Sequence, residues 1–232
     1  MEHTEQGNII SNTGILDLTG KKPEDLEGIS LIENVGLIFA PESLSGALMK
    51  IPQRNVGMTV SLPTTSGKIK VLTGQLTLSG DVFANQAGSP EDILVLAGQA
   101  IITSSIEKIG FSEVIVAGQL IAPKSQEGMI ASAITRLAGQ IAYYNSAAPR
   151  LFMGDHTFSK DFFDLIDGKM AMVIVGSYEI AADVDVETIK QKISEIVLVG
   201  ELTVPKALVP VCQFLATTQL GSIQARDEQA AV

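Results

Sequence analysis

The stretch that decides the fold is Ile196-Val197-Leu198-Val199-Gly200-Glu201-Leu202-Thr203-Val204-Pro205. Two runs of strand-forming residues lie on either side of one glycine. Apolar residues occupy every second position on both sides of Gly200, which is the periodicity of a β-strand. The stretch therefore predicts two strand segments that meet at a bend or bulge, where a residue without a Cβ atom is favoured.

The same arrangement returns along the chain at a mean interval of about 21 residues. The clearest glycines of this repeat are Gly36, Gly57, Gly74, Gly98, Gly118, Gly139, Gly176 and Gly200, and weaker members are Gly14, Gly154 and Gly221. Such a regular repeat predicts a mainly β protein with short helices. We expect a right-handed solenoid of about 10 to 11 turns, whose strands form one or more parallel sheets.

Many of the predicted strands are apolar on both faces, as shown by Val95, Ile115 and Val197 between the alternating positions. Strands of this kind are typical of parallel sheets that are covered on both sides. We therefore expect a short helix or loop to pack outside the sheet in some turns. The candidate helical segments are 41–48, 159–166 and 183–193, with a further helix start at Ser89-Pro90-Glu91-Asp92.

A glutamine directly follows the glycine in four successive copies of the repeat, at Gln75, Gln99, Gln119 and Gln140. If the turns stack in register, each side-chain carbonyl can accept a hydrogen bond from the next amide group, and the four residues form a ladder. The alternative is that they are four exposed polar residues at strand bends. The sequence leaves both interpretations open.

The ends of the chain differ from its body. Residues 1–12 and 226–232 lack the repeat and are predicted to be tails or caps, which leaves 13–225 as a single solenoid domain. The region 145–160 is the least regular, because Gly139 and Gly154 are only 15 residues apart and Pro149 lies between them. We expect a shortened turn, a kink or a division between two stacks in this region.

The chain has 26 acidic and 16 basic residues, which gives a net charge of −10. Nucleic acid and anionic membranes both attract clustered Lys and Arg, so neither is expected as a partner; a basic partner is weakly favoured. The N-terminus lacks the features of a signal peptide, and no apolar run reaches the length of a membrane span. The single cysteine, Cys212, lies in an apolar stretch and is interpreted as a buried thiol. These features predict a cytoplasmic protein.

The sequence holds no phosphate-binding loop, zinc-protease motif or nucleophile elbow. The nearest candidate for a catalytic site is Asp155-His156, with Tyr143, Tyr144 and Asp161 close by in the sequence. A histidine beside a carboxylate can act as a general base, whereas the simpler interpretation is a loop histidine at an irregular turn. No cofactor and no metal site are predicted.

A repeat of about 21 residues with one strand region and a variable outer segment resembles that of leucine-rich-repeat proteins. The segment Ile193-Ser194-Glu195-Ile196-Val197-Leu198 fits the opening L-x-x-L-x-L of that family. The asparagine expected three residues later is replaced by Glu201. A right-handed parallel β-helix fits the repeat equally well, and either resemblance implies a solenoid.

Two functions follow from these observations. A regular repeat without a catalytic constellation favours a non-catalytic scaffold or protein-interaction protein, and self-association is one form of this function. The alternative is an enzyme of the β-helix type that acts on a polysaccharide or a small molecule. Such an enzyme usually carries clustered acids, Arg or His on one sheet face, whereas the sheet positions here are mostly apolar, small or Gln.

Overall fold

The computed structural model describes residues 8–226 of the chain, which form two compact units divided between Lys68 and Ile69. Strands make up 53% and helices 22% of the described residues, so the predicted mainly β class with short helices is confirmed. The predicted parallel pairing is confirmed as well, but it is divided among three sheets of three or four strands.

The first unit contains sheet A, in which three parallel strands follow one another in chain order. These strands are β1 (Asn8–Asp17), β2 (Ile29–Pro41) and β3 (Gln53–Leu62). The 3₁₀ helix η1 (Pro23–Leu26) connects β1 to β2, and η2 (Glu42–Leu44) with α1 (Ser45–Leu48) connects β2 to β3. Residues 8–12 of the predicted N-terminal tail thus lie in a strand, and residues 1–7 are outside the described range.

The second unit contains sheets B and C, each with four parallel strands that follow in chain order. Sheet B consists of β4 (Ile69–Leu78), β5 (Ile93–Ile102), β6 (Glu113–Pro123) and β7 (Ile134–Tyr144), with η3 (Gly80–Ala84), η4 (Lys124–Gln126) and α2 (Glu127–Ala133) between them. Sheet C consists of β8 (Arg150–Phe158), β9 (Met170–Ile180), β10 (Ile193–Val204) and β11 (Ala216–Ala225), with α3 (Lys160–Asp164), α4 (Val186–Lys192), η5 (Lys206–Leu208) and α5 (Val209–Leu215) in the connections.

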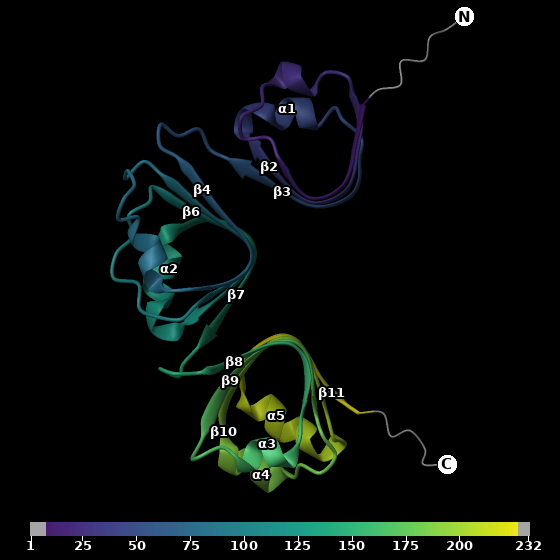
Figure 1. Cartoon of the computed structure of the whole chain (residues 1–232), viewed down its shortest axis with the longest axis vertical. Helices are drawn as coiled ribbons and strands as arrows, with labels where there is room; N and C mark the ends of the chain where they lie inside the picture. The colour runs from purple at the N-terminus through teal and green to yellow at the C-terminus, as the bar shows by residue number, and fades with distance from the viewer. Residues whose placement is uncertain (1–7, 227–232) are drawn as a thin grey trace, which may run out of the picture. The chain divides into compact units, whose positions relative to one another are not determined.

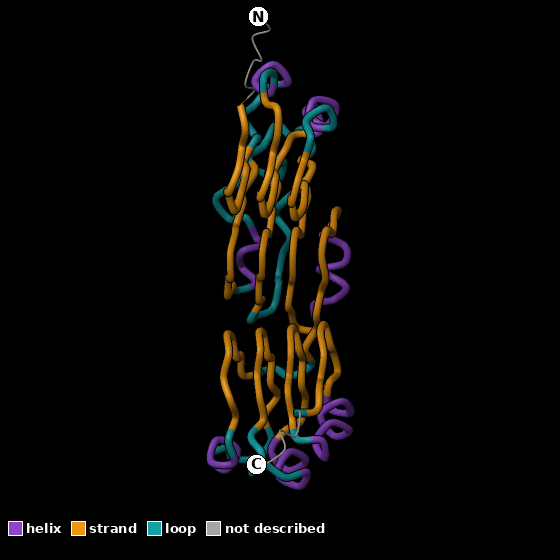
Figure 2. The backbone as a smooth tube through the Cα atoms, turned by 90° about the vertical axis from the view of Figure 1, so that its right-hand side faces the viewer, coloured by secondary structure: helices purple, strands orange, loops and turns teal. Residues whose placement is uncertain are grey.

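The strands of each sheet are strongly bent. Figure 1 shows the strands of a sheet lying over one another as a single arch, with the short helices on the concave side. Figure 2 shows the same strands side by side in each sheet. The main apolar cores lie inside these arches: in sheet C, Ile174 and Leu198 from the strands pack in one cluster with Phe163, Ile189 and Cys212 from the helices.

The outer faces of sheets B and C pack against each other. Ile101, Ile121 and Ala142 of sheet B form one buried cluster with Val173 and Val197 of sheet C. Here the expectation that a helix or loop covers the second face of the strands is wrong, because the cover is another sheet. The apolar character of both strand faces is therefore explained by a helix-lined core on one side and a sheet-to-sheet contact on the other.

The repeat glycines lie directly opposite one another in each sheet. Gly74, Gly98, Gly118 and Gly139 are paired across sheet B, and Gly154, Gly176, Gly200 and Gly221 are paired across sheet C. Neighbouring backbones approach so closely that a Cβ atom on Gly118 would lie 2.0 Å from the carbonyl oxygen of Gly98. In sheet A, Gly36 and Gly57 likewise approach the carbonyl of the preceding glycine.

Three of the four predicted helical segments contain helices. Segment 41–48 holds η2 and α1, segment 159–166 holds α3, and segment 183–193 holds α4. The helix predicted to start at Ser89 is wrong, because residues 89–92 form a single turn. The backbone N–H of Asp92 donates to the carbonyl of Ser89 at 3.0 Å, and β5 begins at the next residue, which leaves no room for a helix.

The two short steps in the glycine series coincide with the ends of sheets. The 17-residue step from Gly57 to Gly74 leads from β3 to β4, and the 15-residue step from Gly139 to Gly154 leads from β7 to β8. Both steps lack a helix in the connection. The irregular region 145–160 therefore includes the passage from sheet B to sheet C, while the extent of one domain over 13–225 stays a prediction.

Among residues 8–226, no helix combines the length and the apolar character that crossing a membrane requires.

Candidate functional site

A row of amide side chains runs across the outer surface of sheet B, directly after the glycines. Gln75, Gln99, Gln119 and Gln140 are in register on β4 to β7. Gln75 Nε2 donates to Gln99 Oε1 at 3.4 Å, and Gln99 Nε2 donates to Gln119 Oε1 at 2.7 Å. The described residues show no side-chain hydrogen bond for Gln140. The structure thus joins three of the four predicted ladder residues and leaves the last one at the edge of the sheet.

A second amide ladder, in sheet A, was missed by the sequence analysis. Asn34 Nδ2 donates to Asn12 Oδ1 at 3.1 Å, and Asn55 Nδ2 donates to Asn34 Oδ1 at 2.9 Å. All three residues have a left-handed backbone conformation, with φ between 52° and 55°, which asparagine tolerates better than most residues. The sequence contains a signal for this ladder, because Asn-x-Gly recurs at Gly14, Gly36 and Gly57.

Each sheet ends on both sides in a strand that has one partner. Within residues 8–226 these edge strands are β1 and β3 in sheet A, β4 and β7 in sheet B, and β8 and β11 in sheet C. Core positions are partly open there: Leu137 on β7 is 49% exposed, whereas its neighbour Val116 on β6 is 1% exposed. On β1, Ile9 and Ile15 lie outside the core cluster of sheet A and are 57% and 41% exposed.

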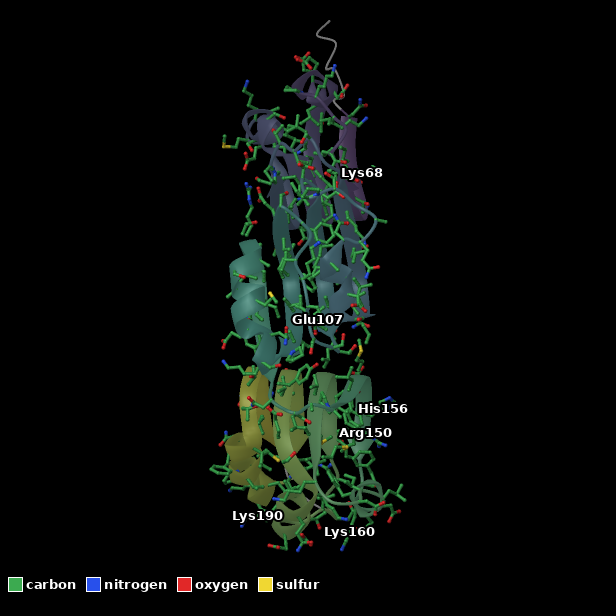
Figure 3. All side chains as sticks on the ribbon, turned by 90° about the vertical axis from the view of Figure 1, so that its left-hand side faces the viewer. Lys68, Glu107, Arg150, His156, Lys160 and Lys190 are labelled. Carbon is green, nitrogen blue, oxygen red and sulfur yellow. The ribbon has the colours of Figure 1, made fainter. Side chains whose placement is uncertain are left out.

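The predicted catalytic candidates Asp155 and His156 lie on β8, one of these edge strands, and both are exposed (His156 in Figure 3). They line a shallow hollow of about 480 Å³ together with Ser177, Glu179 and Glu201. Asp155 Oδ1 accepts a hydrogen bond from the backbone N–H of Ser177 at 3.1 Å rather than from His156. The ring of His156 lies 6.0 Å from the ring of Tyr178. The pair is therefore not arranged as a carboxylate that orients a general base.

Three residues that are close to Asp155 and His156 in the sequence do not join them in the hollow. Tyr143 and Tyr144 belong to β7, and Asp161 belongs to α3; none of them lines the hollow. The hydroxyl of Tyr144 is buried and donates to the carbonyl of Ile102 at 2.8 Å, while Lys124 Nζ lies 5.3 Å from the ring centre of Tyr143. Burial raises the pKa of both tyrosines. Their contacts are structural.

A larger hollow of about 700 Å³ lies beside sheet B, between the segments 81–90 and 107–111. Its charged lining residues are Asp81, Glu107 and Lys108, which are all exposed (Glu107 in Figure 3). The amide of Asn85 holds the two segments together, since Nδ2 lies 3.1 Å from Asp92 Oδ2 and 3.2 Å from the carbonyl of Gly110. These contacts account for the shape of the loops without a bound ligand.

The single cysteine is also structural. Cys212 is fully buried in the core of sheet C, and burial raises the pKa of its thiol to about 12, so the reactive thiolate is suppressed. Within the described part of the chain, no three His, Cys, Asp or Glu residues are grouped so that they could hold a metal ion.

Glu195 on β10 is a buried carboxylate that the sequence analysis did not single out. It accepts hydrogen bonds from the backbone N–H groups of Asn145 and Ser146 and from the hydroxyl of Thr217, at 2.7 to 3.1 Å. Burial alone would raise its pKa, but these hydrogen bonds outweigh burial and lower the pKa. Glu195 thus fastens the connection between sheets B and C to the start of β10 and, through Thr217, to β11.

The chain was compared with protein-family models, with curated proteins and with solved structures, and none of them matches it.

Proposed function

We propose that this protein is a non-catalytic scaffold, built from stacked right-handed solenoid turns, that interacts with further copies of itself. The observation that carries the proposal is that each of the three parallel sheets ends on both sides in an edge strand with one partner among residues 8–226. An edge strand presents a row of backbone N–H and C=O groups that can pair with a strand of another chain.

Features that usually prevent such pairing are scarce on several of these edges. Charged side chains, proline and bulges within the edge are the common means of protection. The segments after the glycine, 75–78 on β4 and 140–144 on β7, contain no charged residue and no proline. β1 contains no Lys, Arg or Pro and ends with its single acid, Asp17. On β4 and β7 the charged residues Lys70 and Arg136, and the register irregularity of β7 at Thr135, lie before the glycine.

The partly open core at the edges gives a driving force for association. A side chain such as Leu137, half exposed beside a fully buried neighbour, loses the rest of its contact with water when another strand is added. Each apolar side chain that becomes buried contributes about 1 kcal/mol or more. A row of such contacts along a strand, together with the backbone hydrogen bonds, supports binding.

The proposal is tested by measuring the molar mass of the purified chain with light scattering and sedimentation over a wide range of protein concentration. We expect the mass to rise with concentration beyond that of one chain. A mass that stays at 24.5 kDa throughout would remove the proposal.

The proposed setting is the cytoplasm. It is supported by the single cysteine, which is buried and takes no part in a disulfide bond. Fractionation of cells that express a tagged chain tests this setting, and recovery of the chain outside the cytoplasm would contradict it.

A further inference from the structure

We infer that copies of this chain add head to tail, so that the last strand of a sheet in one copy pairs in parallel with the first strand of the same sheet in the next copy, glycine opposite glycine. This inference rests on the proposed self-association and names its partner surface. It is carried by three properties of the edges: the direction in which the glycines face, the polarity of the amide ladders, and a glycine that nothing in its own sheet explains.

The glycines give every sheet a direction. In sheet B the missing Cβ of each glycine points at the carbonyl oxygen of the preceding one, at 2.6 Å for Gly98, 2.0 Å for Gly118 and 1.8 Å for Gly139. At the first strand this position is open, because a Cβ on Gly74 would meet nothing within 4 Å. The open side of Gly74 therefore matches the carbonyl that Gly139 presents at the opposite edge.

The glutamine ladder has the same direction. Gln75 donates to Gln99 and Gln99 donates to Gln119, so the Nε2 group of each residue points toward the next strand. This order leaves the Oε1 acceptor of Gln75 at the first edge, and Gln140 at the last edge. A head-to-tail contact places the Gln140 amide where it can donate to Gln75 Oε1 of the next copy, which continues the ladder.

Apolar residues at the two edges match in the same register. With Gly139 opposite Gly74 of the next copy, Leu137 lies opposite Leu72, and Ile141 lies opposite Leu76. These residues occupy the core-facing positions of the arch, where Leu96 and Val116 lie opposite one another inside the sheet. The half-exposed Leu137 then gains a neighbour of the same kind.

Sheet A, in the other unit, shows the same properties independently. Its glycines have no left-handed φ, and Gly36 and Gly57 are explained by carbonyls of the preceding strand, 2.7 Å and 2.5 Å from a Cβ position. For Gly14 on the first strand, neither a left-handed φ nor a close carbonyl explains the glycine, since a Cβ there would meet nothing within 4 Å. In the proposed contact, the carbonyl of Gly57 from another copy lies close to Gly14 and explains why a glycine is needed there.

The asparagine ladder of sheet A supports this reading. Each Nδ2 donates to the preceding asparagine, which leaves the Oδ1 acceptor of Asn55 at the last edge and the amide group of Asn12 at the first edge. The Asn12 amide has a contact of 3.5 Å with the hydroxyl of Ser11, at the limit of a hydrogen bond. Asn12 of the next copy is therefore a fitting donor for Asn55.

This polarity separates the inference from a two-fold dimer. A two-fold axis would bring identical edges together in antiparallel orientation, where two acceptors or two donors of a ladder would oppose each other. A head-to-tail contact uses two different edges, and an edge remains available at each end. The expected product is an open chain of copies that lengthens with concentration.

Crosslinking with introduced cysteines tests the register. Gln75→Cys and Gln140→Cys are prepared as separate proteins, and each is treated with a short thiol crosslinker alone and in a mixture with the other. The native Cys212 does not interfere, because it is buried with a suppressed thiolate. We expect crosslinked dimers in the mixture and about tenfold fewer in either protein alone.

The possible outcomes are distinct. Crosslinking of Gln75→Cys or Gln140→Cys alone, at the level of the mixture, would show that like edges meet and would overturn the inference. Growth of the molar mass with concentration but no crosslink in any sample would overturn it as well, while the proposed self-association would stand. A mass of one chain under all conditions would remove both.

A matched pair of glycine variants tests the first edge without disturbing the fold. Gly14→Ala and Gly46→Ala each add one methyl group at a position with nothing within 4 Å, and neither glycine has a positive φ. Both variants should unfold at the same denaturant concentration as the parent or a higher one. We expect Gly14→Ala to weaken association about tenfold or more, and Gly46→Ala to leave it unchanged. Equal association of the two variants would overturn the inference for sheet A.

Discussion

At the scale of single residues, the repeat glycines of sheets B and C serve two purposes at once, except Gly74 and Gly154 on the first strands. Gly200 has φ of +129°, which residues with a Cβ rarely adopt, and a Cβ atom there would lie 2.1 Å from the carbonyl oxygen of Gly176. The sequence alone indicated a bend at this glycine. It could not show the close approach, since that depends on the strand that lies alongside.

The two purposes can be separated with Gly154 and Gly200. Gly154 also has a positive φ, of +106°, but no atom lies within 4 Å of its Cβ position. Gly154→Ala should therefore lower the free energy of unfolding by about 1–2 kcal/mol through backbone strain. Gly200→Ala should lower the free energy of unfolding by about 1–3 kcal/mol more than Gly154→Ala, because the strands must also move apart. Urea unfolding measures both, and equal losses would show that the close approach costs nothing.

Glu195 gives a prediction for pH dependence. Its pKa is lowered in the folded chain, so its contribution to stability is present above the pKa of the unfolded chain and is lost as the pH falls through the folded pKa. At neutral pH, Glu195→Gln should lower the free energy of unfolding by about 2 kcal/mol, because charge-assisted hydrogen bonds are weakened. The difference from the parent should shrink in acid. A difference that is independent of pH in urea unfolding would contradict this account.

At the scale of elements, the sequence predicts the strands better than what surrounds them. Alternating apolar residues around each glycine located the bent strands, because a strand buried on one face needs that period. The same residues could not show that sheet C covers the outer face of sheet B, since Val197 and Ile101 look alike whether a helix or a sheet covers them. The Ser89-Pro90 signal predicted a helix because local preference ignores the nearby start of β5.

The ladder of sheet A can be tested through its middle residue, Asn34. Asn34→Gly preserves the left-handed conformation, with φ of 52° in the parent, but removes the two ladder hydrogen bonds, which should cost about 1 kcal/mol. Asn34→Ala removes the hydrogen bonds and also strains the backbone, which should cost about 1–2 kcal/mol more. Thermal or urea unfolding measures the stability of the two variants relative to the parent. If the two variants were equally stable, the backbone conformation would not be the reason for asparagine here.

At the scale of the whole molecule, the spacing of the glycines shows where one sheet ends and the next begins. Steps of 20 residues or more return the chain to the same sheet, whereas the steps of 17 and 15 residues lead to a new one. A return to the same sheet needs two arms of a bent strand and a connection back to the start of the strand, and the connections of the short steps, 63–68 and 145–149, are shorter than those between the other described strands. The sequence marked the region 145–160 as irregular, but the equivalent step after Gly57 was not recognised, because its flanking strands are regular.

Charge provides a final test of how copies of the chain meet. With a net charge of −10, two copies repel each other at low ionic strength, and the proposed contacts between edges are made by backbone groups, neutral amides and apolar side chains. Salt screens the repulsion over about 10 Å at 0.1 M and leaves these contacts almost unchanged. Association should therefore strengthen when salt is raised, by about tenfold between low and moderate ionic strength. Binding through opposite charges, such as Glu201 and Glu179 meeting a basic surface, would weaken under the same change. Sedimentation at several salt concentrations distinguishes the two, and weaker association at higher salt would count against pairing through the sheet edges.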